Sequence, residues 1–449
     1  MAQIAHLRRS RIVKAITDVA GSDKDFEQAD IILNRILPTI KIDRELAVTA
    51  AGQAAVLTAL TTSIKCFGSA NLVCDFDAPL KRRLSLGSSL FEAAHAIGAT
   101  ITQSVPGNST HLIAIGNGPD EGAFVRCWWD RWTAGILPPW DEELAGVSGN
   151  PLAGVFAGGL AVREVFANAI GRRRNVNQRS VLSLWCPWNS SSVDDVPPSI
   201  LTLPGKLWFV GLGHLGQGYL WNLAFLPVSD THAILQDDQE VGEENVATGL
   251  LTRHLDFETH NNKARVSARW LEEAGWTTNL IERRNYGDIR LTPEDPPVVL
   301  TSIDEPLARI EIAKAGHQFL IDAGVGHGAL DFEIGQIRVV PSDIDPESLW
   351  SRQTPAKDID AVLRKVAYIE HARKHDRCGT FTLAEASVAV PFVGATVGAL
   401  GIAQLLRLAA LGTTPQILQI ELGMPQGATR GVLNPPSPSA FGGSEFSFA

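Results

Sequence analysis

The chain of 449 residues has room for roughly two to four ordinary domains, and its 45% hydrophobic and 20% charged residues support a large core and argue against wholesale disorder. Its formal net charge of -10 argues against a nucleic-acid-binding protein, because phosphate backbones are bound by a basic face. Five scattered cysteines without a CxxC pair argue against both a disulfide framework and a structural zinc site of the usual spacing.

The N-terminus has no long apolar run and therefore does not resemble a secretory signal. No uninterrupted apolar span of about 18 residues occurs elsewhere, so no membrane-spanning helix is predicted. We expect a cytoplasmic protein without a membrane partner.

The first half is predicted to alternate between helices and strands. A tryptophan-rich stretch at 128–140 is interpreted as packing rather than as a binding surface. The other predicted elements, in chain order, are a helical region at 1–40, a strand at 46–50, a helix at 54–67, strands at 71–77 and 111–117, and an apolar helix at 151–171.

The second half repeats this alternation after a polar, proline-containing segment. Strands that alternate with helices predict a parallel sheet with helices on both faces. We expect a linker at 181–205, with a strand near 181–185, and a flexible tail at 431–449. The predicted elements between them are a strand, glycine turn and helix over 206–226, a strand at 232–238, a helix at 262–275, a strand at 297–305, a helix at 306–316 and a strand at 318–324.

An internal repeat relates the two halves. Residues 50–55 are aligned with 211–216, an offset of 161 (from 50 to 211), and residues 151–160 are aligned with 391–400. The first copy lacks two of the three glycines of the second, and a Cβ there would obstruct the approach of a phosphate to the backbone. We therefore expect residues 1–180 to be a degenerate copy that packs on residues 206–430, so that one chain forms a pseudo-dimer. A homodimer stays open.

A glycine motif opens the second copy. Gly211, Gly213 and Gly216 follow an apolar strand and precede a helix, so backbone N–H groups at the helix N-terminus are free to face an anion. Asp237 ends the next strand, where an acid accepts the ribose hydroxyls of a bound nucleotide. These signals predict a nucleotide, and NAD fits them as well as ATP does. A tight packing turn without a ligand is the alternative.

The residues that follow resemble the ThiF/MoeB/HesA and ubiquitin-activating enzyme superfamily. That family has a GxGxxG turn, then D-x-D-x-V-x-x-S-N-L-x-R-Q, then a Lys, then a strand that ends in D-x-x-D-N with an Arg after it. Asp237, Asn245, Lys263, Asp304 and Arg309 match in order, and the resemblance covers roughly 207–412. It implies Rossmann-like doubly wound sheets, with a degenerate N-terminal copy packed on an active C-terminal adenylation domain.

Two positions depart from the family pattern. Thr248 stands where the family has its Arg, and Arg253 is the candidate substitute. Glu305 stands where the family has an Asn after the strand-ending acid. These departures concern the contacts to phosphate rather than the class of nucleotide.

The resemblance implies ATP-dependent adenylation of the C-terminal Gly carboxylate of a ubiquitin-like or sulfur-carrier-like protein. Gly211, Gly213, Gly216, Asp237 and Asn245 would bind ATP, and a conjugating enzyme is a further implied partner. Lys263 would hold phosphate oxygens and Asp304 would hold Mg²⁺, although a solvated lysine and a helix cap are the structural alternatives for these two.

Paired members of the family complete the ATP site with an arginine from the partner's N-terminal region. Arg8, Arg9 and Arg11 of the first half are the candidates here, and a solvated basic helix start is the alternative.

Cys378 is the candidate for a thioester-forming cysteine. It follows a basic run, His371 to Arg377, and precedes Pro391, where the last long apolar helix begins. Nearby positive charge favours the thiolate, which is the nucleophilic form. An incidental loop cysteine is the alternative. The other four cysteines, Cys66, Cys74, Cys127 and Cys186, are predicted to be buried.

Two other functions compete with an activating enzyme. A NAD-dependent oxidoreductase would share the glycine motif, but Asn245, Lys263 and Asp304 together count against it. A non-catalytic scaffold would explain Thr248 and Glu305 as decay. Exchange of pyrophosphate into ATP in the presence of the partner would separate the three.

Overall fold

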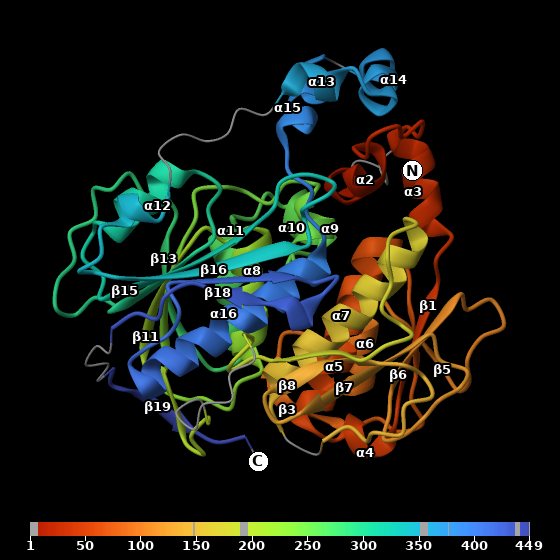
Figure 1. Ribbon diagram of the computed structural model, residues 1–449, viewed down its shortest axis with the longest axis horizontal. Coiled ribbons are helices and arrows are strands. Elements are labelled where there is room, and N and C mark those ends of the chain that lie inside the picture. The colour runs from red at the N-terminus through yellow and green to blue at the C-terminus, as the bar shows by residue number, and fades with distance from the viewer. Residues whose placement is uncertain are drawn as a thin grey trace.

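The computed structural model describes residues 8–146, 149–188, 196–350, 358–375, 377–435 and 441–448. It contains two α/β bodies, each built on a largely parallel sheet, with long helices between the sheets and a small helical group above them (Figure 1). The predicted fold class, α/β with doubly wound sheets, is confirmed.

The N-terminal body is built on a seven-stranded sheet of order β5-β2-β1-β6-β7-β8-β9. The first five of these strands are parallel, and β8 and β9 are antiparallel additions. The strands are β1 (Pro38–Ile42), β2 (Asn71–Val73), β5 (Thr100–Thr102), β6 (His111–Ile115), β7 (Val125–Asp130), β8 (Thr133–Leu137) and β9 (Ser180–Ser183).

The C-terminal body has an eight-stranded sheet of order β13-β12-β11-β14-β15-β16-β17-β18. Its first five strands are parallel and its last three are antiparallel. The strands are β11 (Lys206–Val210), β12 (His232–Gln236), β13 (Thr277–Ile281), β14 (Val298–Thr301), β15 (Phe319–Val325), β16 (Ile334–Pro341), β17 (Ile417–Glu421) and β18 (Thr429–Arg430).

Seven strands of each sheet have the same order and the same directions. In both, the first strand of the body is third from the edge, and the chain then crosses to its other side. This shared topology supports the predicted duplication.

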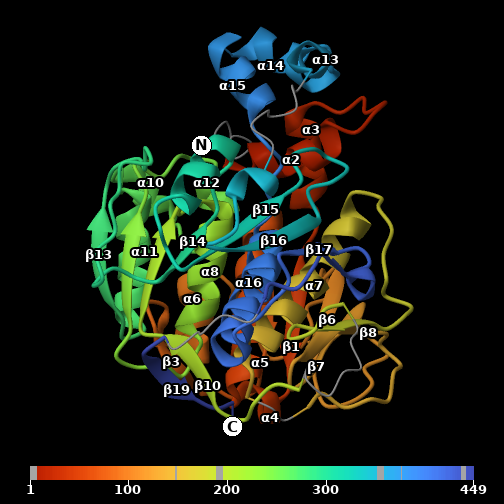
Figure 2. The same cartoon turned by 60° about the vertical axis from the view of Figure 1, so that its left-hand side comes forward.

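Four helices fill the space between the sheets. They are α5 (Ala50–Phe67) and α7 (Pro151–Ala169) from the first half, and α8 (His214–Ala224) and α16 (Pro391–Leu411) from the second. Figure 2 shows them side by side in the middle of the molecule, with a sheet on either side. Both α7 and α16 begin with a proline, whose missing N–H is not needed in the first helical turn.

Glycines let these helices approach to backbone contact. In α7, a Cβ at Gly154 would lie 2.0 Å from the carbonyl oxygen of Ala51, and one at Gly158 would lie 2.4 Å from that of Ala55. Both contacts are far inside van der Waals separation, so only a glycine fits at either position.

The second helix pair repeats this contact. A Cβ at Gly394 would lie 2.8 Å from the carbonyl oxygen of His214, and one at Gly398 would lie 2.5 Å from Gly218. In the alignment of the two copies, Gly154 and Gly158 correspond to Gly394 and Gly398. The residues that these glycines contact therefore also correspond: Ala51 to His214 and Ala55 to Gly218. The true offset between these helices is therefore 163 (from 51 to 214), and the predicted offset of 161 is wrong.

The reason for the shift is the connection after the first strand of each half. The one-turn helix α4 (Arg44–Ala47) lies between β1 and α5, whereas only residues 211–213 separate β11 from α8. The strand predicted at 46–50 is therefore wrong, because residues 38–42 form the strand instead. The expected glycine-turn remnant at 50–55 is the first turn of a helix.

The end of the chain also differs from the prediction. Instead of a flexible tail over the whole of 431–449, β19 (Gly443–Phe446) pairs with β10 (Leu201–Pro204) in an antiparallel ribbon. Residues 436–440 and 449 lie outside the described residues. Phe441 and Phe446 are buried, so apolar contacts hold this strand in place. The expected linker at 181–205 thus contributes to β9 and β10.

By length and composition alone, helices α7 and α16 could cross a membrane. In the folded protein, however, 89% and 94% of their most apolar 18-residue segments are buried. Their apolar character is that of core helices.

A buried ion network also joins the two bodies. Arg163 of α7 donates two hydrogen bonds of 2.9 Å to the Glu333 carboxylate, which precedes β16, and one of 2.8 Å to Glu164. A bidentate arginine–carboxylate pair has a fixed geometry, so this contact adds a directional constraint on how the bodies are oriented.

The small helical group packs on the N-terminal helices. It comprises α13 (Ile359–Leu363), α14 (Val366–Lys374) and α15 (Arg377–Glu385), and it lies over α2 (Ser10–Thr17) and α3 (Phe26–Asn34) (Figures 1 and 2). We call α13, α14 and α15 the crown. The helices expected over 1–40 are thus α2 and α3, although the strand β1 begins at residue 38, and residues 1–7 lie outside the described part.

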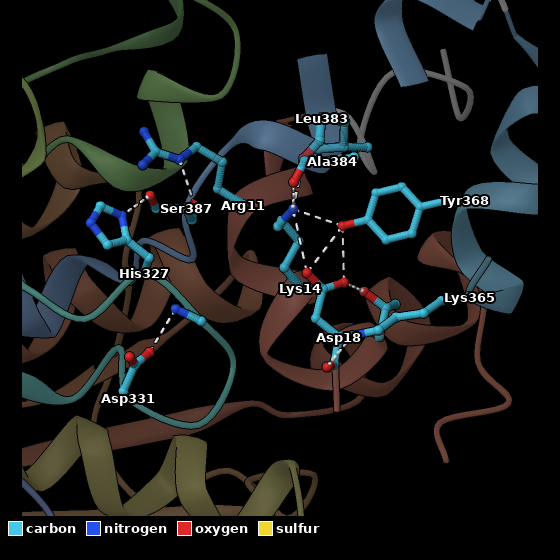
Figure 3. Close-up of polar contacts among 12 residues, drawn as sticks. Arg11, Lys14, Asp18, His327, Asp331, Lys365, Tyr368, Leu383, Ala384 and Ser387 are labelled. Atoms are coloured by element: carbon cyan, nitrogen blue, oxygen red, sulfur yellow. Dashed lines mark hydrogen bonds and ion pairs between the residues drawn. The ribbon is translucent and has the colours of Figure 1, made fainter. Parts of the chain in front are cut away.

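A buried polar cluster holds the crown on α2 (Figure 3). The ammonium group of Lys14 donates to the Tyr368 hydroxyl at 2.7 Å and to the carbonyl oxygen of Leu383 at 2.6 Å. The Tyr368 hydroxyl donates to Asp18 at 2.9 Å. The crown is therefore fixed by specific polar contacts as well as by apolar packing.

The helix contacts lead to a prediction about stability. Gly158→Ala should lower the free energy of unfolding by about 1–3 kcal/mol, the range for overpacking a core. The better helix propensity of alanine, about 1 kcal/mol, acts in the opposite direction, but a contact of 2.4 Å with a backbone oxygen forces the helices apart. Urea unfolding measures the change. Gly107→Ala, where an added Cβ meets nothing within 4 Å, is the control, and a stabilised Gly158→Ala would contradict the close packing.

Candidate functional site

A cleft of about 330 Å³ opens at the carboxyl ends of the parallel strands in the C-terminal sheet. Its floor is the junction of β11 and β14, where the strand order reverses direction. Ligands of open α/β sheets bind at such switch points. The cleft is bordered by the glycine turn, the ends of β12 and β14, α9 (Asn245–Thr248), the start of α11 (Lys263–Glu273) and the loop after β13.

The three glycines of the motif have three different roles. Gly211 has a φ of +82°, and a Cβ there would lie 2.7 Å from Ile303. A Cβ at Gly216 would lie 2.1 Å from the Gly211 carbonyl oxygen, so this glycine permits close packing of helix on turn. Gly213 faces open space in the cleft just before α8 begins. An anion can therefore approach the N-terminus of α8.

Asp237 is buried beneath this turn. Its carboxylate accepts hydrogen bonds from the backbone N–H groups of Leu212 at 2.7 Å and of Gln239 at 2.9 Å. The side chain therefore fixes the glycine turn. Its expected contact with a ribose stays a prediction.

Lys263 lies at the start of α11 and is almost fully buried. Its ammonium group donates to the side-chain oxygen of Gln239 at 2.7 Å. The alternative of a solvated lysine is therefore wrong. Gln239, which the sequence interpretation missed, occupies the second acidic position of the family pattern, two residues before Val241.

Asn245, the first residue of α9, lines the same cleft, and its side-chain oxygen accepts a hydrogen bond of 2.9 Å from the Gly242 N–H. Thr248 is buried and donates to the Glu244 carbonyl oxygen, so it does not replace the arginine of the family pattern.

Asp304 is exposed on the cleft wall after β14. The alternative role of a helix cap is wrong, because the N-cap of α12 (Pro306–Ala313) is Glu305, whose side chain makes no capping bond. Glu305 instead pairs with Arg284, a cleft residue that the sequence interpretation missed, at 2.7 Å.

The first half contributes Arg11 of α2 to the cleft. Its Nε donates to the carbonyl oxygen of Ser387 at 2.9 Å, and the guanidinium group lies beside the loop that carries His327 (Figure 3). Burial lowers the pKa of Arg11, whereas the charges of Asp304 and Glu244 act to raise it. The cleft therefore contains an arginine from each body.

The other two candidate arginines have different roles. Arg9 is buried against Asp30 at 2.8 Å, and Arg8 lies 3.6 Å from Glu243, outside the cleft. Of the three, only Arg11 lines the cleft.

Two predicted catalytic residues, Arg253 and Cys378, do not line the cleft. Arg253 points away from it and donates to the carbonyl oxygen of Ser85 at 2.6 Å. It therefore does not replace the missing arginine at Thr248, and no spacing rule would have revealed this.

Cys378 is exposed on α15 in the crown rather than in the cleft wall. Two cations of the basic run are paired with carboxylates, Arg373 with Glu370 and Lys374 with Glu27. The other four cysteines are buried, as predicted, and burial raises the pKa of Cys127 to about 12.

A second hollow of about 320 Å³ adjoins the cleft and shares the wall formed by Asp304 and His327. Arg309 and Arg338 line this hollow, and both face the buried carboxylate of Asp322. The Arg309 Nε lies 3.4 Å from one carboxylate oxygen, and the Arg338 Nη1 lies 4.0 Å from the other. Burial raises the pKa of Asp322, which the two guanidinium groups act to lower. This second hollow places two guanidinium groups beside the cleft, together with the carboxylates of Asp304 and Asp331.

His214 begins α8 and forms part of the cleft floor. Its Nε2 lies 2.8 Å from the carbonyl oxygen of Val390, and burial lowers its pKa to about 4. The imidazole is therefore neutral at physiological pH.

This pKa leads to a prediction about pH. The unfolded state takes up a proton on His214 below about pH 6.5, whereas the folded state does so only near 4, so stability falls as the pH drops through this window. The full difference is about 3 kcal/mol. Urea unfolding at pH 7 and pH 5 should show a smaller loss for His214→Gln than for the wild type. The exposed His260→Gln is the control, and equal losses in all three proteins would be evidence against an imidazole that the fold keeps neutral.

Comparisons with known proteins show which protein family the chain resembles. Residues 203–412 match the family model of the BilD C-terminal domain, and residues 38–184 match that of the BilD N-terminal domain. The "Bacterial E1-like protein BilD" of Collimonas sp. (strain OK412) is 30% identical over 413 residues, which are 90% of this chain and 88% of that protein.

Among solved structures, E. coli MccB with MccA-N7isoASN is 16% identical, covers 48% of this chain and 61% of its own, and has a TM-score of 0.33. E. coli MccB with AMPCPP and MccA has the same identity and TM-score, and covers 60% of its own chain. The E1-like part of the predicted resemblance is confirmed by the BilD relative, while the narrower ThiF assignment stays a prediction. The chain belongs to the BilD family of bacterial E1-like proteins.

Proposed function

We propose that this protein uses ATP to adenylate the C-terminal carboxylate of a ubiquitin-like or sulfur-carrier-like protein. The observation that carries the proposal is the cleft at the switch point, where a glycine turn, Asp237 and Lys263 meet Asp304 and the Arg11 side chain of the other body. The BilD relative that covers most of the chain is named E1-like, which supports the same reaction class.

In this proposal the phosphates of ATP lie at the N-terminus of α8, where unpaired backbone N–H groups favour an anion. Lys263 and Arg11 would neutralise the phosphate charge from opposite walls, and Asp237 would face the ribose from beneath the turn. A triphosphate suits two converging cations better than the single pyrophosphate bridge of NAD does.

Magnesium fits the exposed carboxylate of Asp304, because Mg²⁺ is usually held by one or two carboxylates together with substrate phosphates. The described residues contain no group of three or more His, Cys, Asp or Glu side chains arranged for a metal, so phosphate oxygens and water would supply the remaining ligands. When bound, the ion would neutralise the charge that develops on departing pyrophosphate.

The substrate carboxylate would enter through the second hollow, past Arg309 and Arg338. One carboxylate oxygen forms a bond to the α-phosphorus, the bond from this phosphorus to the bridging oxygen breaks, and pyrophosphate leaves. A C-terminal carboxyl group has a pKa of about 3.5, so it is already ionised and no general base is required. The protein's task is alignment and charge neutralisation.

The degenerate role proposed for the first half has its own support. At the equivalent switch point, between β1 and β6, the side chain of Asp43 accepts a hydrogen bond of 3.1 Å from the Asn117 N–H. A carboxylate at this point repels phosphate. The first half would therefore not bind a nucleotide itself, although it contributes Arg11 to the cleft of the second half.

The proposed function predicts first that the protein binds ATP and does not bind NAD. Asp237→Ala should weaken ATP binding by about 1.5–3 kcal/mol, the scale of hydrogen bonds to a charged group. Calorimetry with both nucleotides measures this in the full chain. Tight binding of NAD without binding of ATP would refute the proposed function.

A second prediction concerns Asp304. In the wild type, Mg²⁺ should strengthen ATP binding relative to EDTA, and Asp304→Ala should remove most of this gain while the thermal melt stays unchanged. The exposed Asp23→Ala, in the first half, is the control. Pyrophosphate exchange with a small protein partner recovered by pull-down should be lost in Asp304→Ala alone. An unchanged rate would remove Asp304 from the mechanism.

We also propose that Cys378 receives the acyl group. Its thiolate sulfur would bond to the acyl carbon, the bond from that carbon to the phosphate oxygen would break, and AMP would leave. The crown that carries Cys378 rests on α2, the helix that also supplies Arg11, so the two reaction centres share one supporting element.

Cys378→Ala should therefore leave pyrophosphate exchange intact and abolish a thiol-sensitive adduct with the partner on non-reducing gels. Cys74→Ala, a buried cysteine in the first half, is the control and should keep the adduct. If the adduct persists in Cys378→Ala, another nucleophile carries it. If the wild type forms none, the adenylate passes directly to an acceptor.

A further inference from the structure

Lys65 belongs to α5 in the N-terminal half, but its ammonium group ends in the C-terminal half. Its Nζ donates hydrogen bonds to the carbonyl oxygens of Val246 at 2.7 Å and of Thr252 at 2.9 Å. Both acceptors belong to the segment that forms α9 and the turn after it. A cation from one body therefore holds a backbone segment of the other.

The physical reason for this contact is the length of α9. A helix of four residues, Asn245–Thr248, leaves its last carbonyl groups without intrahelical partners. The carbonyl oxygen of Asn245 is satisfied within the segment, by the N–H of Gly249 at 2.8 Å and the hydroxyl of Thr252. That of Val246 receives the Lys65 ammonium, which also suits the negative end of the helix. Lys65 thus caps α9 from outside.

Helix α9 is a thin wall between two spaces. Asn245 faces the nucleotide cleft, whereas Val246 and Lys65 line a hollow of about 480 Å³ between the bodies. A shift of α9 toward that hollow would move Asn245 away from the nucleotide. The position of Asn245 therefore depends on the Lys65 contact.

We propose that Lys65 is a positioning residue through which the N-terminal half holds Asn245 in place for ATP, so that ATP affinity depends on the charge of Lys65. The inference rests on the proposed function, because it takes ATP as the ligand of the cleft. The N-terminal half, which lacks the glycine turn, would then contribute to the cleft in two ways: Arg11 lines it, and Lys65 holds α9 in position.

The charge of Lys65 changes within the physiological range. Burial lowers its pKa to about 7, the carboxylate of Asp256 acts to raise it, and the nearby Arg253 acts to lower it further. Burial raises the pKa of Cys66 itself, so this thiol stays neutral. The other ionisable groups of the hollow are Arg8, Arg9 and His254.

Above about pH 7 the neutral amine is a weaker donor and no longer complements the α9 dipole. ATP binding should therefore weaken as the pH rises through this value.

The experiment compares the full-length wild type with Lys65→Met, which keeps an unbranched side chain, shorter only by the terminal ammonium group, and so removes its donors. The probe is ATP with excess Mg²⁺, measured by calorimetry at pH 6 and pH 8.5. We expect Lys65→Met to raise Kd about tenfold at pH 6, equivalent to about 1.4 kcal/mol. The ratio of the two Kd values should shrink at pH 8.5. Other groups that titrate in the cleft cancel in this ratio.

Lys41→Met is the matched control, since Lys41 also lies in the first half but pairs with Asp120 at 2.9 Å, away from α9. It should bind ATP as the wild type does. Asn245→Ala combined with Lys65→Met should weaken binding by less than the sum of the single changes, because both act through one contact. A general loss of stability would not produce this non-additivity. If Lys65→Met fails to fold, Lys65→Gln carries the same test.

The outcomes separate the two proposals. If the wild type does not bind ATP, the proposed function fails and this inference fails with it. If the wild type binds ATP and Lys65→Met binds equally well at both pH values, only the role of Lys65 is refuted. A Kd ratio that is the same at pH 6 and pH 8.5 would refute the dependence on charge.

Discussion

The structure depends on backbone contact among the four helices between the sheets. Protein interiors are packed as densely as organic crystals, so two α/β bodies can share one core only if their facing helices fit without voids. Glycines of α7 and α16 remove the Cβ atoms that would hold each helix away from its partner. The two helix pairs also touch each other: a Cβ at Gly159 of α7 would lie 2.7 Å from the Thr396 methyl group of α16. The bodies therefore meet at a surface that tolerates little sliding.

This rigid arrangement allows one half to serve the site of the other. Arg11 enters the cleft from α2, and Lys65 reaches α9 from α5. Both contacts are hydrogen bonds of specific length and direction, which a loose interface would not maintain. The Arg163–Glu333 pair adds a directional contact at the same interface. The N-terminal half therefore supplies side chains to the cleft of the C-terminal half and to the helix beside it.

Helix α2 connects the cleft with the crown. Arg11 faces the cleft, and Lys14, three residues later, anchors Tyr368 of the crown. Neighbouring positions on one helix therefore contact the proposed site of adenylation and the element that bears Cys378. Loss of the crown contact would take the Tyr368 hydroxyl and the Leu383 carbonyl oxygen away from the buried Lys14–Asp18 pair, and hydrogen bonds lost by buried charges are costly in a protein interior. The crown is consequently held in a defined place above the cleft.

Much of the C-terminal half could be predicted from the sequence. The strand, glycine turn and helix at 206–226, the acid at Asp237 and the acid at Asp304 are local signals, because each depends on the few residues around it. Chain order then brings the ends of parallel strands to one edge of the sheet, which explains why Asn245 and Lys263 also lie in the cleft.

The tertiary structure decided what local patterns cannot encode. The offset of 163 between the helices depends on the extra turn α4 and on which backbone atoms touch across the helix pairs. Arg253 has a suitable spacing in the chain but points to Ser85, whereas Arg11, 200 residues before Gly211 (from 11 to 211), lines the cleft. Likewise, Lys65 lies in an apolar helix pattern and gives no sign of its role. Sequence patterns fix which residues follow one another on a strand or helix, but which body supplies the cations of a shared site depends on packing between segments far apart in the chain.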